Sequence, residues 1–410
     1  MIERVVITGL GVVSSIGIGQ EEFWQGLLSG KSGISPVNSF DATQHFSHNG
    51  GEVRNFDPDK YNFRDRQGSM SRATQMAVAA AELAVTDAGL HRDAISERNV
   101  SVCIGTTTGS IHIIEMINNY IIRGEAFPPE LASQLPTHST AAEVAGEFGI
   151  SGNAWMFSTA CAAGNYAIGY GYDLIRLGRA DMVLVGGSDA FSRISFTGFN
   201  QFRAVAPGFC QPFDKNRKGM IPAEGAGVLV LESEESARLR NARVYAEVLG
   251  YGLSCDASHM TSPSVDGIVK CMIKAMKQAE IGPGDVDYIS AHGTGTLNND
   301  RAECAAIKEV FGERYSAVPV SSIKSMLGHT MGAASALEAI ACSLAVAYDM
   351  IPPTINYETP DTECDIDCVP NTARRHTVNV ALNNSYAFGG NNACVVLNKY
   401  MDNTGGKNAG

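Results

Sequence analysis

A strand-like run meets a helix of small residues at Phe157-Ser-Thr-Ala-Cys-Ala-Ala-Gly164. The same arrangement returns at Ser321-Ser-Ile-Lys-Ser-Met-Leu-Gly-His-Thr-Met-Gly332, where another strand-like run leads into another small-residue helix. Junctions of this kind are typical of layered α/β proteins. The echo between the two segments fits a fold that is duplicated within one chain.

Short β-rich runs alternate with longer helical patterns along the rest of the chain, which again predicts a layered α/β architecture. Several runs are apolar at consecutive positions, as strands covered on both faces are. The expected strands are Arg4–Thr8, Val100–Gly105, Asp181–Gly186, Gly227–Leu231, Tyr245–Leu249, Val286–Ala291, Val318–Ser322, Val378–Leu382 and Ala393–Leu397. The expected helices are Gln20–Leu28, Ser71–Ala88, Thr140–Phe148, Ala162–Leu177, Gly267–Ala279, Arg301–Phe311 and Gly332–Tyr348.

The chain has 410 residues, of which 44% are hydrophobic and 18% charged, so it can bury more than one core. No linker rich in Pro, Gly or Ser divides it, and we therefore expect two halves that share a broad interface. We place the boundary near Gly250–Ser254, which gives an N-terminal half over 1–250 and a C-terminal half over 251–400. Residues 401–410 are polar and Gly-rich and are expected to form a disordered tail.

Charge and composition exclude several classes of function. The net charge of −12, from 31 basic and 43 acidic residues, argues against nucleic-acid binding, which needs a basic surface. The apolar stretch Gly332–Met350 carries Glu338 and Asp349, which favours a buried helix over a membrane span. No signal sequence is recognised, and the ten cysteines show no spacing typical of a zinc site. We expect a reduced, soluble, cytoplasmic protein without a metal.

A glycine motif near the start resembles a dinucleotide-binding loop only in part. Gly9-Leu-Gly11-Val-Val-Ser14 follows the first expected strand. It lacks the third glycine of such loops and the acidic residue about twenty positions on that would bind a ribose. We therefore interpret it as a tight turn.

Cys161 stands apart from the other cysteines, because small residues surround it and a helical pattern follows at once. A thiol at a helix N-terminus faces unpaired N–H groups and the positive end of the helix dipole, which favour the thiolate and predict a lowered pKa. The same N–H groups could stabilise an oxyanion. Packing as an inert buried cysteine is the alternative.

Two histidines occupy similar glycine-flanked turns after strands. His292 opens His292-Gly-Thr-Gly-Thr296, and His329 lies in Lys324-Ser-Met-Leu-Gly-His-Thr-Met-Gly-Ala333. Because ligands gather at the carboxyl ends of strands in α/β proteins, we expect Cys161, His292 and His329 to converge. A purely structural histidine or a zinc site would be the alternatives, and no paired metal spacing such as HExxH supports the second.

Ordered motifs extend this pattern over nearly the whole chain, from Val5-Val-Ile-Thr-Gly-Leu-Gly11 to Asn384-Ser-Tyr-Ala-Phe-Gly-Gly-Asn391. Between them lie Thr159-Ala-Cys161, Pro212-Phe-Asp-Lys-Asn-Arg217, Glu224-Gly-Ala-Gly227, the two histidine motifs and Pro352-Pro-Thr-Ile-Asn356. Together they resemble the elongating β-ketoacyl-acyl-carrier-protein synthases, members of the thiolase superfamily. The resemblance implies an α/β fold, the thiolase-like duplicated αβαβα five-layer sandwich, and a dimer whose site is reached through a tunnel.

The resemblance also implies roles for individual residues. Cys161 would accept the acyl chain as a thioester, and His292 and His329 would bind the malonyl thioester carbonyl and promote loss of CO₂. Lys324 matches the catalytic lysine of the family, Glu303 matches the acidic residue expected near it, and Asp300 would be structural. Phe388 matches the gate of the family, and its N–H would complete an oxyanion hole with the N–H of Cys161. Thr294 and Thr296 match positions that contact the pantetheine arm. Thr108 lies where some members carry an Ile that limits chain length.

Departures from the family pattern bear on the pathway. The gating loop reads Ala387-Phe-Gly-Gly-Asn-Asn392, Ser258 replaces an aromatic residue, and Thr296-Leu-Asn-Asn-Asp-Arg301 is closer to type II polyketide ketosynthases. These features favour a ketosynthase for a polyketide or polyene. The alternatives are fatty-acid elongation, a thiolase acting on CoA esters, for which Cys394 would have to be a second catalytic cysteine, and a non-catalytic chain-length factor.

The family implies an acyl carrier protein as partner and no cofactor, since the substrates are carried on its phosphopantetheine. Carrier proteins are acidic, so docking needs a local basic patch. The candidates are Lys60, Arg64, Arg66 and Arg203, with an ordinary solvated surface as the alternative. Both a homodimer and a heterodimer with a chain-length-factor-like homologue remain open.

Overall fold

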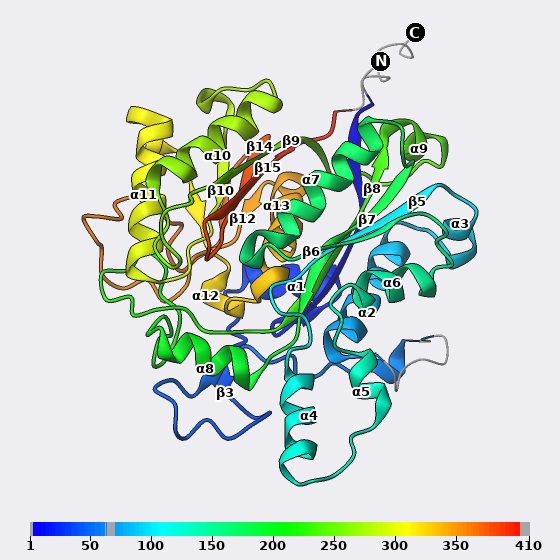
Figure 1. Ribbon diagram of the computed structural model, residues 1–410. Helices are drawn as coiled ribbons and strands as arrows, with labels where there is room; N and C mark the ends of the chain where they lie inside the picture. Colours follow the sequence, from blue (N-terminus) through cyan, green and yellow to red (C-terminus); the bar gives the residue numbers. More distant parts are fainter. Residues whose placement is uncertain (1–2, 62, 64–69, 402–410) are drawn as a thin grey trace.

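The strands form two copies of one five-stranded pattern (Figure 1). In the computed structural model, which describes residues 3–61, 63 and 70–401, the first copy runs in the spatial order β6 (Ala154–Phe157), β5 (Val100–Gly105), β7 (Met182–Asp189), β8 (Gly225–Ser233) and β1 (Val5–Ser14). The second runs β11 (Val320–Ser321), β10 (Tyr288–Ser290), β14 (Val380–Tyr386), β15 (Asn391–Asn398) and β9 (Ala246–Cys255). In each copy the first three strands of this order pair in parallel, and the fourth and fifth strands join them through antiparallel pairings. The predicted duplication is confirmed.

The two copies are joined by a short antiparallel pairing between their first strands. Val5–Ile7 of β1 pairs with Ala246–Val248 of β9. The boundary expected near residue 250 falls inside β9, which is the first strand of the second copy. Of the expected tail, residues 402–410 lie outside the described residues.

Helices complete the five layers. Between the two sheets lie α7 (Ala163–Arg176) and α13 (Ala334–Tyr348), which contact strands of both copies and each other. The outer face of the first sheet is covered by α2 (Arg72–Asp87) and α6 (Ser139–Glu147). That of the second is covered by α10 (Val265–Gln278), and α11 (Leu297–Phe311) packs beside α10 and contributes to the same hydrophobic core. The stretch Met331–Tyr348 is long and apolar enough to cross a membrane, but 89% of it is buried in this central layer. Its burial between two sheets accounts for its composition.

Each expected strand and helix overlaps an observed element, with ends displaced by a few residues. Among the described residues, the sequence analysis missed six α-helices: α3 (Arg92–Ser96), α4 (His112–Ile122), α5 (Pro129–Ser133), α8 (Arg193–Gln201), α9 (Glu234–Leu239) and α12 (Lys324–Leu327). It also missed strand β6 and the two-residue strands β2 (Gly17–Ile18), β3 (Ser35–Pro36), β4 (Asn49–Gly50), β12 (Met350–Ile351) and β13 (Arg374–Arg375). Helix α1 (Gln20–Leu28) has the expected bounds.

The interpretation of the first glycine motif as a tight turn is wrong. Gly9 and Gly11 lie within strand β1, which continues to Ser14. A Cβ atom on Gly9 would lie 2.1 Å from the backbone oxygen of Ala84, and one on Gly11 would lie 1.8 Å from that of Ala80. The glycines therefore allow helix α2 to pack directly on the strand.

Candidate active site

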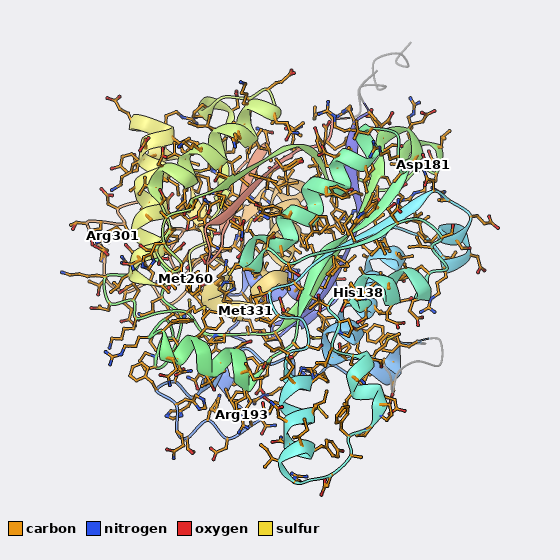
Figure 2. All side chains as sticks on the ribbon, viewed as in Figure 1. His138, Asp181, Arg193, Met260, Arg301 and Met331 are labelled. Carbon is orange, nitrogen blue, oxygen red and sulfur yellow. The ribbon has the colours of Figure 1, made fainter. Side chains whose placement is uncertain are left out.

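Cys161 is presented by a strained turn between β6 and α7. Ala160 has a φ angle of 51°, in the left-handed region that residues other than glycine rarely adopt, and the short 3₁₀ helix η3 (Ala160–Ala162) leads into α7. The second copy repeats this turn, because Met331 has a φ angle of 55° and η6 (Met331–Ala333) leads into α13. Figure 2 labels Met331 in the central part of the molecule. The two turns bring Cys161 and the loop of His329 to the same region.

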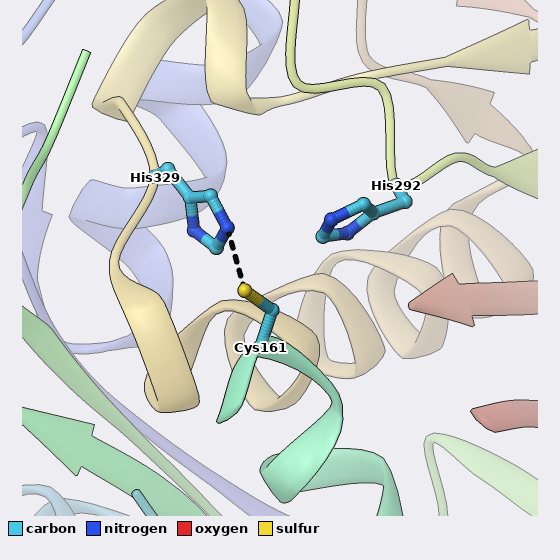
Figure 3. Close-up of side chains that lie close together, drawn as sticks. All are labelled: Cys161, His292 and His329. Carbon is cyan, nitrogen blue, oxygen red and sulfur yellow. Dashed lines mark hydrogen bonds between the residues drawn. The ribbon is translucent and has the colours of Figure 1, made fainter. Parts of the chain in front are cut away.

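The structure brings the three expected side chains together (Figure 3). Nε2 of His329 lies 3.1 Å from Sγ of Cys161. The rings of His292 and His329 are nearly perpendicular, at 83°, with centroids 5.4 Å apart. One potential ligand atom from each of the three side chains lies within 4.8 Å of the other two. A small group placed among them would contact the sulfur and both imidazoles.

Neighbouring donors fix the tautomer of each imidazole. The backbone N–H of Met331 donates to Nδ1 of His329 over 3.1 Å, so the proton of a neutral ring must be on Nε2. Nζ of Lys324 lies 3.4 Å from Nδ1 of His292 and, as an ammonium, can only donate to it. Lys324 is itself buried in an ion pair with Glu338. Both histidines therefore present an Nε2–H group to the site.

These tautomers bear on the question of a metal. Cys161, His292 and His329 lie close enough together to ligate one ion. A ring nitrogen binds a metal through its lone pair, whereas both Nε2 atoms carry a proton. The arrangement fits hydrogen bonding to an oxygen atom better than metal coordination, and the absence of a metal stays a prediction.

Burial controls the protonation of the site. It lowers the pKa of both imidazoles well below 6.5, and the charge of Lys324 lowers them further, so both rings are neutral near pH 7. It also raises the pKa of the Cys161 thiol to about 11, against the opposing effects of Lys324 and of nearby N–H groups. The expectation of a lowered thiol pKa is wrong, because Cys161 is only 7% exposed and burial disfavours the thiolate.

Two buried carboxylates hold the loop that carries His292. The oxygens of Glu303 accept the backbone N–H groups of His292 and Gly293, each over 2.8 Å. Asp300 accepts the N–H of Gly295 over 3.2 Å and that of Phe213 over 2.9 Å, in line with its expected structural role. Glu303 was expected near Lys324 and lies close enough for the charge of that lysine to lower its pKa. The ion pair of Lys324, however, is made with Glu338, which the sequence analysis did not single out.

Phe388 lies where a gate and an oxyanion hole would require it. The backbone N–H groups of Phe388 and Cys161 hydrogen-bond the sulfur and lower its pKa. The half-buried ring packs on Phe199 at 6.0 Å and on Phe202 at 6.4 Å, between ring centroids. The backbone therefore offers two donors at the thiol while the side chain covers the pocket.

Comparison with known proteins agrees with this geometry. The sequence matches the β-ketoacyl synthase N-terminal domain over residues 2–237 and the C-terminal domain over residues 245–358, which is more than half of the chain. The chain belongs to the β-ketoacyl synthase family.

Relatives of this β-ketoacyl synthase include a 3-oxoacyl-carrier-protein synthase and a polyketide synthase subunit. The "3-oxoacyl-[acyl-carrier-protein] synthase 2" of Synechocystis is 38% identical over 97% of this chain and 99% of its own length. The "Tetracenomycin polyketide synthase ketoacyl synthase alpha subunit" of Streptomyces glaucescens is 40% identical over 96% of this chain and 97% of its own.

Solved structures give the same family. The structure named "The ishigamide ketosynthase/chain length factor" is 46% identical, with a TM-score of 0.95 over 98% of this chain and 100% of that one. A type II polyketide acyl-carrier protein in complex with its ketosynthase, bound to the hexaketide, matches with 35% identity and a TM-score of 0.90 over 98% of this chain and 100% of that one. The thiolase-like fold and the membership of an acyltransferase family are thereby established.

The threonines expected to contact the substrate differ in their positions. Thr294 and Thr296 line the pocket of Cys161, with their hydroxyl oxygens 2.9 Å apart. Thr108 is not among the residues that line this pocket, and its backbone N–H donates to Asp189 over 2.9 Å. Its role as a limit on chain length stays a prediction.

The docking candidates are only partly described. Lys60 is exposed at the end of the 3₁₀ helix η1 (Pro58–Lys60). Arg64 and Arg66 lie outside the described residues. Arg203 is exposed and lines a groove together with Lys218 and Phe388, so a basic surface borders the gate.

Sequence reasoning missed two buried acids of the site. Glu338 was treated as an interruption of an apolar stretch, although a lone carboxylate inside such a helix signals a buried partner, here Lys324. Asp189 ends strand β7 and carried no motif that would single it out.

Proposed function

We propose that this chain is a ketosynthase that condenses an acyl group held on Cys161 with malonyl carried by an acyl carrier protein. The observation that supports this proposal most directly is the convergence of one thiol with two imidazole Nε2–H donors. The sulfur can hold an acyl group, and two donors can stabilise an enolate oxygen. No cofactor beyond the phosphopantetheine of the carrier is required for this chemistry.

The first step is acyl transfer to the enzyme. Sγ of Cys161 attacks the thioester carbonyl, and the N–H groups of Cys161 and Phe388 stabilise the oxyanion that forms. The bond to the pantetheine sulfur then breaks, and the proton lost by the thiol ends on the departing pantetheine thiol. The protonated Nε2 of His329 donates to the sulfur, 3.1 Å away, as its negative charge develops.

The second step breaks the bond between the malonyl carboxylate and its neighbouring carbon. CO₂ leaves, and the electron pair forms an enolate whose oxygen accepts the Nε2–H groups of His292 and His329. The enolate carbon attacks the acyl carbonyl, a carbon–carbon bond forms, and Cys161 leaves as a thiolate that regains a proton from solvent. Loss of CO₂ supplies the carbanion, so neutral histidines are sufficient and no strong base is needed.

We place the reaction in type II polyketide or polyene biosynthesis, in the cytoplasm. Two observations support this pathway: the 46% identity to the ishigamide ketosynthase/chain length factor and the 40% identity to the tetracenomycin subunit. The same relatives favour an acyl carrier protein as donor and a homologous subunit as partner, either a second copy or a chain-length-factor-like chain. The free state of all ten cysteines agrees with a reducing compartment.

Fatty-acid elongation is the second candidate, because the Synechocystis synthase is 38% identical over almost the whole chain. A thiolase reaction is not favoured. Cys394, which would have to serve as a second catalytic cysteine, lies in strand β15, is fully buried and packs within the second core.

Intact mass spectrometry after incubation with acyl-carrier protein, without a malonyl donor, tests the first step. We expect one acyl adduct on the wild type, none on Cys161→Ala, and an unchanged adduct on Cys255→Ser, whose thiol is exposed. Addition of malonyl-carrier protein should then release a product extended by two carbons. If the acylated wild-type protein formed no condensation product, the proposed reaction would be contradicted. The acyl groups that Cys161 accepts would distinguish polyketide or polyene substrates from fatty-acid substrates.

A further inference from the structure

A buried carboxylate links the two copies of the fold behind the active site. Asp189 is the last residue of strand β7 in the first copy and has no exposed surface. It accepts hydrogen bonds from the N–H groups and hydroxyls of one loop and from one N–H of the second copy: Thr106 Oγ1 at 2.8 Å, Thr107 N at 2.7 Å, Thr108 N at 2.9 Å and Oγ1 at 3.4 Å, Gly109 N at 2.6 Å, and Gly332 N at 2.7 Å. This many donors hold the carboxylate in one orientation.

The two oxygens of Asp189 have different partners. Within the described part of the chain, Oδ1 accepts only from residues 106, 108 and 109 of the first copy. Oδ2 accepts from Thr107 of the first copy and from Gly332 of the second. Oδ2 is therefore the atom that ties the loop of residues 106–109 to the turn before α13.

That turn sets the tautomer of His329. Gly332 follows Met331, whose N–H donates to Nδ1 of His329. Met331 adopts a left-handed backbone at a φ angle of 55°, a conformation that residues other than glycine rarely adopt and that needs support from its surroundings. The hydrogen bond from Gly332 to Asp189 is one such support, on the next residue along the chain.

Packing joins the same two segments independently of the hydrogen bonds. A Cβ atom on Gly332 would lie 2.5 Å from the backbone carbon of Thr106 and from the backbone nitrogen of Thr107. The absence of a side chain at Gly332 thus lets the two loops touch through their backbones. A displacement of residues 106–107 would be passed to Gly332 and to the N–H group beside it.

We propose that Asp189 is a positioning residue for the condensation: its Oδ2 atom holds Gly332 and so keeps the Met331 N–H on Nδ1 of His329. Nε2 of His329 then carries the proton that the enolate oxygen needs. The inference rests on the proposed function, in which His329 is a hydrogen-bond donor. It also joins the loop of Thr108, expected to border the acyl pocket, to the catalytic histidine.

Asp189→Asn tests this inference with little change of volume. An amide nitrogen cannot accept an N–H group, and it meets fewer donors at the Oδ2 position than at Oδ1. The substitution therefore removes the hydrogen bonds from Gly332 and Thr107 and keeps those made to Oδ1. We expect malonyl decarboxylation to fall about 100-fold, as misplaced reacting groups commonly cause. Acylation of Cys161 should fall by no more than a few-fold, because it loses only the hydrogen bond from His329 to the sulfur and keeps the N–H groups of Cys161 and Phe388 that stabilise its oxyanion. Thr106→Val, which removes a donor to Oδ1 but keeps Gly332 in place, should leave both rates nearly unchanged.

Nitrogen NMR of ¹⁵N-histidine-labelled protein provides a readout that does not depend on turnover. The wild type should show His329 protonated on Nε2 only, and Asp189→Asn should show a mixture of tautomers. An equal fall in acylation and decarboxylation, or an unchanged tautomer, would mean that Asp189 serves only the fold and would overturn the inference. If the wild type decarboxylates no malonyl thioester, the proposed function fails, and the tautomer measurement alone decides the role of Asp189.

Discussion

Lys324→Met separates the effect of the buried ammonium on the reaction from its effect on the fold. Lys324 and Glu338 are 1% and 2% exposed and form an ion pair beneath His292. Methionine keeps most of the length and volume of lysine but removes the charge and the donor to Nδ1. The single variant leaves Glu338 buried without its counterion, whereas Lys324→Met combined with Glu338→Met leaves no buried charge at this place.

The two variants should differ strongly in stability. Removing one partner of a buried ion pair costs about 3–5 kcal/mol, while replacing both partners with apolar residues of similar volume is often close to neutral. Burial raises the pKa of Glu338 to about 7 even with Lys324 beside it, so the carboxylate left alone will hold its proton and soften this loss. We therefore expect the single variant near the lower end of that range and the double variant to recover most of the free energy of unfolding.

The rate should not recover in the same way. Nζ of Lys324 lies 3.4 Å from Nδ1 of His292, and the enolate oxygen would be bound on the far side of the ring. With a hydrogen bond of about 2.8 Å at Nε2, the oxygen lies about 8 Å from the ammonium. At an effective dielectric constant of about 20, charges at this distance attract by about 2 kcal/mol. Loss of that attraction by itself corresponds to about a 30-fold slower decarboxylation. In the double variant the negative charge of Glu338 is lost as well, which offsets part of this effect.

Urea unfolding and malonyl decarboxylation, measured on the same preparations, check both parts. The expected result is a double variant that is nearly as stable as the wild type but still slower, by up to about 30-fold. A double variant that decarboxylates malonyl at the wild-type rate would refute the reasoning, because Lys324 would then act through stability alone.

Three further predictions address the thiol, the central packing and the docking surface. Because burial raises the pKa of Cys161 to about 11, its alkylation by iodoacetamide should speed up about tenfold per pH unit between about pH 7 and pH 9. Mass spectrometry can follow the alkylation of Cys161 itself, and a rate that levels off in this range would contradict the raised pKa. Gly332→Ala should lower the free energy of unfolding by about 1–3 kcal/mol through its backbone clash, whereas Gly146→Ala, with no atom within 4 Å of the added carbon in helix α6, should raise it by up to about 1 kcal/mol; thermal melts that shift equally would count against this packing. Arg203→Glu with Lys218→Glu should raise KM for malonyl-carrier protein more than it lowers kcat, and an unchanged KM would remove this groove from docking.

The meeting of Cys161, His292 and His329 could be predicted because each lies in a turn of small residues after a strand-like run, and such turns collect at one edge of a sheet. The burial of Cys161 could not. A sequence shows that a thiol precedes a helix, but the layers that cover it come from both copies of the fold. For this reason the pKa was expected to fall and instead rises.

Other omissions have equally local causes. The partner of Lys324 could not be chosen between Glu303 and Glu338 from spacing, because each acid lies on a helix that starts shortly after His292 or His329. Helix α4 lacks the pattern of a core helix: among its residues only Ile113 is buried, and Ile121 and Ile122 are 59% and 81% exposed. Apolar residues that do not face the interior of the chain leave no usable periodicity.

The repeated turn before α7 and α13 shows how the parts of the site are divided between the two copies. In one copy the residue after the left-handed position is Cys161, and in the other the residue after it is Gly332. The same bend, present twice, thus presents the thiol of Cys161 at one occurrence and supports the ring of His329 at the other. Because the thiol comes from one repeat and both histidines from the other, neither half expressed by itself contains the complete site, which forms only at the interface between the two repeats.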